Sequence, residues 1–171
     1  MPVITCPSCQ TELPDNAAFC LSCGHAIEQE TELKAPNEID REWLMNVFVS
    51  DGYKCEEADE SPLLFWARHE ERMNASVRLY PALGLFSMAS TWALKRSRRD
   101  EARVQGAVNT YNSSSLLWTA WIFQDQTTLG MSAIYTFSAR TSPQRIKAYL
   151  DISNKVFFES LTDTGLIQIL Q

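Results

Sequence analysis

The stretch TCPSCQTELPDNAAFCLSCG, residues 5–24, decides the fold of the first part of the chain. It contains two Cys-x-x-Cys pairs, Cys6 with Cys9 and Cys20 with Cys23. Each pair can turn tightly and offer two thiolates to one tetrahedral ion, so the spacing predicts a zinc ribbon. A redox Cys-x-x-Cys or two disulfides is the alternative, but the duplicated spacing favours zinc.

The residues around the cysteines agree with metal binding. Gly24 can adopt the positive φ that the second turn needs, and residues 14–16 favour a chain reversal between the pairs. About twenty residues cannot bury enough apolar surface to fold alone, so the metal is expected to supply on the order of 10 to 16 kcal/mol of folding free energy. Four thiolates leave no open coordination position, so the zinc is predicted to be structural and His25 to be surplus.

The segment resembles the short zinc ribbons at the N-terminus of many bacterial proteins, which read CPxCGxxxxxxxxFCxxCG. It departs from that pattern at Gln10, where a glycine is usual. Such ribbons serve nucleic-acid binding, protein docking and structure alike, so the resemblance implies a metal and leaves the role open. The matching residues are Cys6, Pro7, Cys9, Phe19, Cys20, Cys23 and Gly24.

Composition limits the other possibilities. The 171 residues are 45% hydrophobic, enough for one core with a small appendage, and the net charge is −6. Residues 1–37 hold five acidic residues against Lys34 alone, so the ribbon is expected to repel phosphate, and nucleic-acid binding by it is disfavoured. The sequence has no signal-peptide pattern and no apolar run of about 18 residues, so a soluble, cytoplasmic protein without a membrane span is expected.

After the ribbon, assigned to residues 1–27, a charged and Pro-containing stretch over residues 28–37 predicts an exposed linker. Residues 38–171 then alternate between helical and strand periodicity. The predicted class is α+β, an antiparallel sheet flanked by helices in the order α-β-β-β-α-β-β-α, with residues 85–94 continuing the sheet. The first helix is expected to have Asn37 as its N-cap, the second a capping box at residues 97–100, and the third Ser142 as N-cap before Pro143.

Residues 38–171 resemble the YbjN family of bacterial sensory-transduction regulators, which is similar in fold to the type III secretion chaperones. The resemblance implies a chaperone-like domain that binds a protein partner and can form a homodimer. It is carried by Gly52-Tyr53, the strand region from Val77-Arg78-Leu79-Tyr80 to Ser87-Met88-Ala89-Ser90, the Asn109 and Asn112 pair, and Tyr149-Leu150-Asp151.

No catalytic residues are predicted, because the sequence shows neither a nucleophile with a base nor an open metal site. His69 is expected to be a solvated loop histidine. Cys55 lies beside Glu56 and Glu57, whose charges disfavour a thiolate, so it is expected to be a structural thiol.

Six residues are candidates for partner contacts. Asn109 and Asn112 lie three apart on the second helix, where local backbone bonding is the favoured role and a polypeptide or dimer contact the alternative. Arg98 and Arg99 belong to a basic cluster over residues 95–103 that can serve an acidic partner, although such clusters are commonly only solvated. Trp118 and Trp121, three apart in a strand, are expected on opposite faces, which leaves one of them exposed unless helices cover both faces.

Together these patterns predict a non-enzymatic protein-interaction or chaperone-like regulatory module. The zinc ribbon is expected to act as a tethered accessory docking element. The alternative is a zinc-ribbon regulator associated with nucleic acid, which would require a salt-sensitive complex despite a pI near 4.9.

Overall fold

A computed structural model describes residues 3–6, 8–14, 20–25, 33–95, 101–125 and 127–170. The chain divides into two compact units, Met1–Leu33 and Lys34–Gln171. This division falls inside the stretch predicted to be a linker. Lys34 already pairs with Thr141 through two backbone hydrogen bonds of 3.0 and 2.8 Å, so the second unit begins before residue 38.

The first unit is built on a two-stranded antiparallel sheet. Strand β1 (Val3–Thr5) pairs with β2 (Glu12–Pro14), and Ile4 lies opposite Leu13. Leu13, Cys6 and Cys20 form the small buried cluster that the structure describes in this unit. So few apolar contacts cannot offset the conformational entropy of ordering the segment, which is why a metal is needed to hold it.

The second unit confirms the predicted α+β class. Its order is α1, four strands, α2, two strands and α3, so residues 85–93 do continue the sheet. The elements are α1 (Arg41–Ser50), β3 (Lys54–Glu57), β4 (Leu64–Arg68), β5 (Ala75–Tyr80), β6 (Leu85–Ala93), α2 (Glu101–Ser114), β7 (Trp118–Ile122), β8 (Thr128–Thr136) and α3 (Pro143–Asp163), with short 3₁₀ turns η1 (Pro36–Glu38), η2 (Pro81–Leu83) and η4 (Leu166–Ile169).

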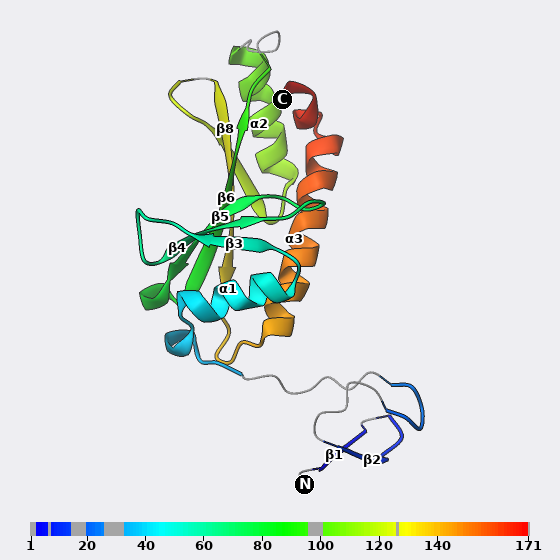
Figure 1. Cartoon of the computed structure of the whole chain (residues 1–171). Helices are drawn as coiled ribbons and strands as arrows, with labels where there is room; N and C mark the ends of the chain where they lie inside the picture. The colour runs from blue at the N-terminus through cyan, green and yellow to red at the C-terminus, as the bar shows by residue number, and fades with distance from the viewer. Residues whose placement is uncertain are drawn as a thin grey trace. The chain divides into compact units, whose positions relative to one another are not determined.

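The six strands form one antiparallel sheet in the order β3-β4-β5-β6-β8-β7. Along β4 and β5, buried and more exposed residues alternate, so each strand buries one face and leaves the other open. The buried face packs against the helices, and α3 runs alongside the sheet in Figure 1. A sheet covered on one side only is a common antiparallel arrangement.

The long helix α3 supplies much of the core. Its buried positions fall on one stripe, Ile146, Leu150, Ser153, Asn154, Phe157 and Leu161. Phe157 packs edge-on against Trp118, with ring centroids 5.0 Å apart. The indole of Trp118 also donates a hydrogen bond of 3.0 Å to the carbonyl of Ser153, so β7 and α3 are joined by both packing and polar contact.

The helix starts were predicted with mixed success. Ser142 caps α3 as expected, accepting a hydrogen bond from the Arg145 N–H at 3.3 Å. Asn37 as the cap of α1 was wrong. That role belongs to Asp40, whose carboxylate accepts from the Trp43 N–H at 2.7 Å, because Glu38 instead bonds back to the Ala35 N–H at 2.8 Å and closes the separate turn η1. The capping box over residues 97–100 lies outside the described residues.

A polar network ties the β4–β5 hairpin to both neighbouring helices. Arg72, in the hairpin turn, forms ion pairs with Asp51 at the end of α1 and with Asp151 on α3, the second at 2.9 Å. Asn154 accepts from the Met73 N–H at 3.0 Å and donates to the Tyr53 hydroxyl at 2.9 Å. Buried polar groups are tolerated when satisfied in this way, so the network fixes the hairpin rather than weakening the core.

Candidate metal centre and interaction surface

The four ribbon cysteines lie together at one point. Their sulfur atoms are all within 4.8 Å of one another; Cys6 and Cys23 are 3.7 Å apart, and Cys9 and Cys20 are 3.4 Å apart. Tetrahedral zinc with Zn–S bonds of about 2.3 Å requires sulfur–sulfur distances of about 3.8 Å. The set therefore fits a structural zinc ion, and four thiolates fill its coordination sphere.

The two halves of the centre are built alike. The Gln10 N–H donates to the Cys6 carbonyl at 2.9 Å, and the Gly24 N–H donates to the Cys20 carbonyl at 2.8 Å. Both donors have positive φ, 59° at Gln10 and 72° at Gly24. Gln10 therefore occupies the same left-handed position as Gly24, and its departure from the ribbon pattern carries a backbone cost of about 1–2 kcal/mol.

The surroundings of Cys9 and Cys23 shift the pKa values of their thiols in opposite directions. The Thr11 hydroxyl and N–H lower the pKa of Cys9 to about 6. For Cys23 the His25 N–H acts in the lowering direction, but the neighbouring Cys9 thiol and burial outweigh it and raise the pKa to about 11. Without a metal the pKa of the Cys9 thiol is thus lower than that of Cys23, whereas bound zinc holds all four sulfurs as thiolates.

Cys55 and His69 are titratable residues outside the metal centre. Cys55 is half-buried, and burial raises the pKa of its thiol to about 11, which agrees with a structural thiol. His69 is half-buried rather than solvated: its Nδ1 accepts from the Glu71 N–H at 3.0 Å, and its ring packs on Tyr53 with centroids 5.0 Å apart. His69 lies in the turn as expected, but it is less solvated than expected because its ring closes the hairpin turn.

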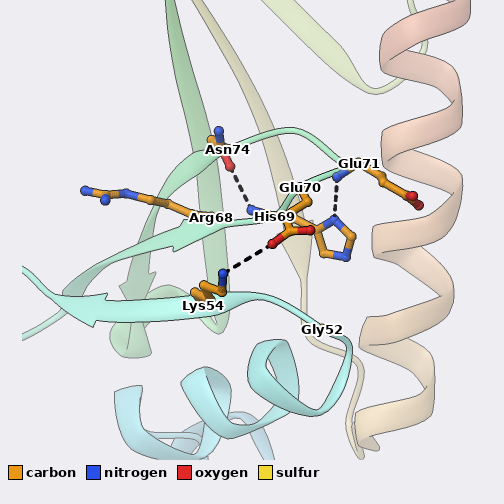
Figure 2. Close-up of a pocket in the computed structure, with 7 residues that line it drawn as sticks. All are labelled: Gly52, Lys54, Arg68, His69, Glu70, Glu71 and Asn74. Atoms are coloured by element: carbon orange, nitrogen blue, oxygen red, sulfur yellow. Dashed lines mark hydrogen bonds and ion pairs between the residues drawn. The ribbon is translucent and has the colours of Figure 1, made fainter.

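A polar hollow of about 610 Å³ opens beside this turn. Figure 2 shows the His69 ring below Glu71, with Lys54 reaching toward Glu70 from the neighbouring strand β3. Lys54 and Glu70 pair at 3.3 Å, with both side chains at least four-fifths exposed. Paired, solvated charges of this kind contribute little energy to binding or stability. The hollow is lined mainly by polar residues in contact with solvent, so it is an open surface feature rather than an enclosed site.

The open face of the sheet carries a second, more apolar hollow of about 230 Å³. Small side chains of β5 and β6 form its floor, chiefly Ser76, Ala89 and Thr91, and Trp66 of β4 stands at its side. Trp66 lies opposite Ser76 in the strand pairing and is 42% exposed. The two hollows share Arg68 and Asn74, so they meet at the end of the hairpin.

The two tryptophans of β7 lie on opposite faces. Trp118 is buried in the core, whereas Trp121 is 36% exposed on the open face. The Trp121 indole lies across Gly130 of β8, where an added Cβ would come within 2.3 Å of the ring. Glycine at this position therefore lets the indole lie flat on the sheet backbone. Other large side chains on the open face are Tyr80, Phe123 and Ile134.

The two asparagines of α2 play different parts. Asn109 is exposed and accepts from the Gln105 side chain at 3.1 Å. Asn112 bonds both backbone groups of Ala120: it accepts from the N–H at 2.7 Å and donates to the carbonyl at 2.9 Å. Because β7 is an edge strand, Asn112 occupies hydrogen-bonding groups that an added strand would use.

Of the remaining candidates, Arg98 and Arg99 lie outside the described residues. Trp66 and Arg78 were not predicted as contact residues from the sequence, although the alternation of buried and exposed residues in β4 and β5 places them on one face. No described helix is both long and apolar enough to span a membrane.

Comparison with known proteins agrees with this division of the chain. Residues 5–27 match the family model of the zinc-ribbon domain. The structure is similar to the crystal structure of YbjN from E. coli, described as a candidate transcription regulator, with a TM-score of 0.57 and 12% identity over 76% of this chain and 94% of that one. No curated protein matches the sequence. The chain thus joins a zinc-ribbon segment to a unit with the YbjN fold.

Proposed function

We propose that the protein is a non-enzymatic interaction module of chaperone-like or regulatory character, in which the second unit binds a polypeptide. The observation that carries the proposal is the open face of the sheet. On this face Trp66 stands beside a hollow with a floor of small residues, and further large side chains, Tyr80, Trp121, Phe123 and Ile134, are exposed. Exposed aromatic residues beside a hollow are typical of binding surfaces.

The zinc ribbon serves in this proposal as a second docking point. Leu21, between two of the metal ligands, is 95% exposed and offers an apolar contact on a rigid turn. A second contact made through a linker raises the apparent affinity without strengthening either contact. Zinc itself is structural here, because all four of its positions are taken by thiolates.

Affinity capture from the native host tests the proposal. The bait is the full zinc-loaded chain, compared with the Leu21→Ser variant and with the Cys6→Ser, Cys9→Ser variant, and the zinc content of each is measured. A protein retained by all three baits, and more weakly by the two ribbon variants, would support binding by the second unit with the ribbon as accessory. A full chain that retains no protein would refute the proposal.

A nucleic-acid role is the second candidate, and the basic residues between 95 and 103 favour it. Against it stand the net charge of −6 and the acidic first unit, since phosphate binding depends on a local excess of cations. Titration with single- and double-stranded DNA at 50 and 200 mM salt separates the two. Tight binding that weakens steeply with salt would favour nucleic acid, and its absence at both salt concentrations is expected.

Homodimer formation, implied by the fold resemblance, is also part of the proposal. Sedimentation equilibrium of the full chain at micromolar concentration measures it directly.

A further inference from the structure

Among the described residues of the open face, Arg78 is a cation without an ion pair, unlike Arg68 and Lys54. Arg68 pairs with Glu56 at 3.4 Å and Lys54 with Glu70 at 3.3 Å. Arg78 is exposed and forms no ion pair with any residue that the structure describes. In the strand pairing it lies between Leu64 of β4 and Ser87 of β6, so neither residue directly opposite it carries a carboxylate. Charge complementarity at this point calls for an acidic group from outside.

The apolar hollow lies two residues along the same strand. Ser76 forms part of its floor and is opposite Trp66, and Arg78 follows on the same face of β5. Two residues of a strand span about 7 Å. An extended segment that runs along β5 therefore places one side chain over Ser76 and the second-next side chain beside Arg78.

The size of the hollow limits what enters it. Its volume of about 230 Å³ corresponds to about eight water molecules at roughly 30 Å³ each, enough for one bulky side chain. With an indole at its side, an aromatic or large aliphatic side chain fits the hollow best, since aromatic pairs gain energy beyond their buried area.

A second copy of the chain fits this face poorly. In an isologous dimer, Trp66 of each copy would enter the hollow of the other copy. The twofold axis would then run along the strands, midway between β4 and the hollow over β5 and β6. With strands about 4.8 Å apart, that axis passes close to β5. It would bring Arg78 against the same arginine of the other copy, in a contact with no carboxylate to compensate.

We propose that the open face binds an extended segment of a different protein in which a bulky apolar residue and an acidic residue are two positions apart. The apolar side chain enters the hollow beside Trp66, and the carboxylate pairs with Arg78. The inference rests on the proposed polypeptide-binding function and names the surface and the chemistry of the partner.

Selection from a random twelve-residue peptide library displayed on phage tests it. The full zinc-loaded chain is the target, with Ala89→Arg as the blocked-floor variant and Ile152→Ser, on the opposite side in α3, as the matched control. The selected peptides are expected to be enriched in an acidic residue two positions from an aromatic or leucine. Capture should fall at least about 30-fold with Ala89→Arg, the loss typical of a hot spot, and stay unchanged with Ile152→Ser.

A double-mutant cycle on one selected peptide tests the ion pair. Arg78→Gln is expected to lower the affinity for the acidic peptide about tenfold. The affinity for the same peptide with glutamine in place of its acidic residue should change less than twofold. If Ala89→Arg shifts the urea midpoint of unfolding, Trp66→Ser replaces it, since that exposed side chain contributes less to the core.

The results distinguish failure of this binding surface from failure of the general polypeptide-binding function. Peptides without an acidic preference, or capture that survives both Ala89→Arg and Trp66→Ser, would overturn this surface while the general function stands. Failure to enrich any peptide on the full chain would count against both. A dimer that Ala89→Arg converts to a monomer would assign the face to a second copy and overturn the inference.

Discussion

Replacing Asn112 with alanine is expected to destabilise the second unit and leave partner affinity unchanged. The side chain makes two hydrogen bonds to the backbone of Ala120, of 2.7 and 2.9 Å, and joins α2 to the edge strand β7. If Asn112 were instead a partner contact, its loss would lower affinity and leave stability as it was. The two roles therefore predict opposite results.

The magnitude follows from the bonds that are lost. Each contributes about 0.5–1.5 kcal/mol net, so the pair contributes about 1–3 kcal/mol. Alanine is a better helix former than asparagine by up to about 0.7 kcal/mol, and this gain masks part of the loss. Asn109→Ala has the same gain and removes only an exposed bond to Gln105, so it is the matched control. The difference between the two variants isolates the contribution of the Ala120 contact.

Urea unfolding followed by tryptophan fluorescence measures that difference. All five tryptophans lie in the second unit, so the signal does not report on the ribbon. With a slope of about 2 kcal/mol/M, Asn112→Ala should unfold roughly 1 M earlier than Asn109→Ala. Equal midpoints for the two variants would show that the bonds to Ala120 do not support the fold.

Three further outcomes are expected. Chelation of zinc should abolish the structure of the ribbon, seen as loss of its dispersed amide signals in NMR spectra, while the urea midpoint measured by tryptophan fluorescence stays unchanged. A shift of that midpoint would show that the second unit depends on the metal. Gln10→Gly should raise zinc affinity roughly fivefold, because relieving the left-handed backbone strain at Gln10 gains about 1–2 kcal/mol, more than the entropy that glycine loses on folding. An affinity that falls in a competition titration would contradict the symmetry of the two turns. Alkylation of Cys55 should be slow at pH 7.5 and accelerate up to about pH 11, since burial raises the thiol pKa above its ordinary 9.0 to about 11. The stability that this shift contributes is present below pH 9 and is lost as the pH rises through 11. Rapid labelling of the native protein at pH 7.5 would be inconsistent with the burial.

The features that depend on local patterns were predictable from the sequence. The Cys-x-x-Cys spacing identified the metal ligands because four thiolates at that spacing have few other uses, and the α+β class followed from the periodicity of residues 38–171. Ser142 before Pro143 also gave the start of α3, since both residues favour a helix start by local geometry.

Features that depend on tertiary contacts were not predictable. Asp40 rather than Asn37 caps α1, because Glu38 is taken up by the turn η1, which local preference alone does not reveal. The partners of Asn112 and Arg72 lie on other elements of the fold, and a single sequence does not show which strand ends up at the edge. The role of His69 was missed for the same reason, since its ring packs on Tyr53, sixteen positions earlier in the chain.

Site-specific photo-crosslinking in the native host tests the central claim most directly. A photoreactive phenylalanine analogue replaces Trp66 on the open face in one protein and Ile152 on α3 in another, both in the full chain. A discrete polypeptide adduct is expected from position 66 and none from position 152, and Arg78→Gln should reduce the yield of the adduct at position 66. Adducts of equal yield at both positions, or an adduct at position 152 alone, would contradict it.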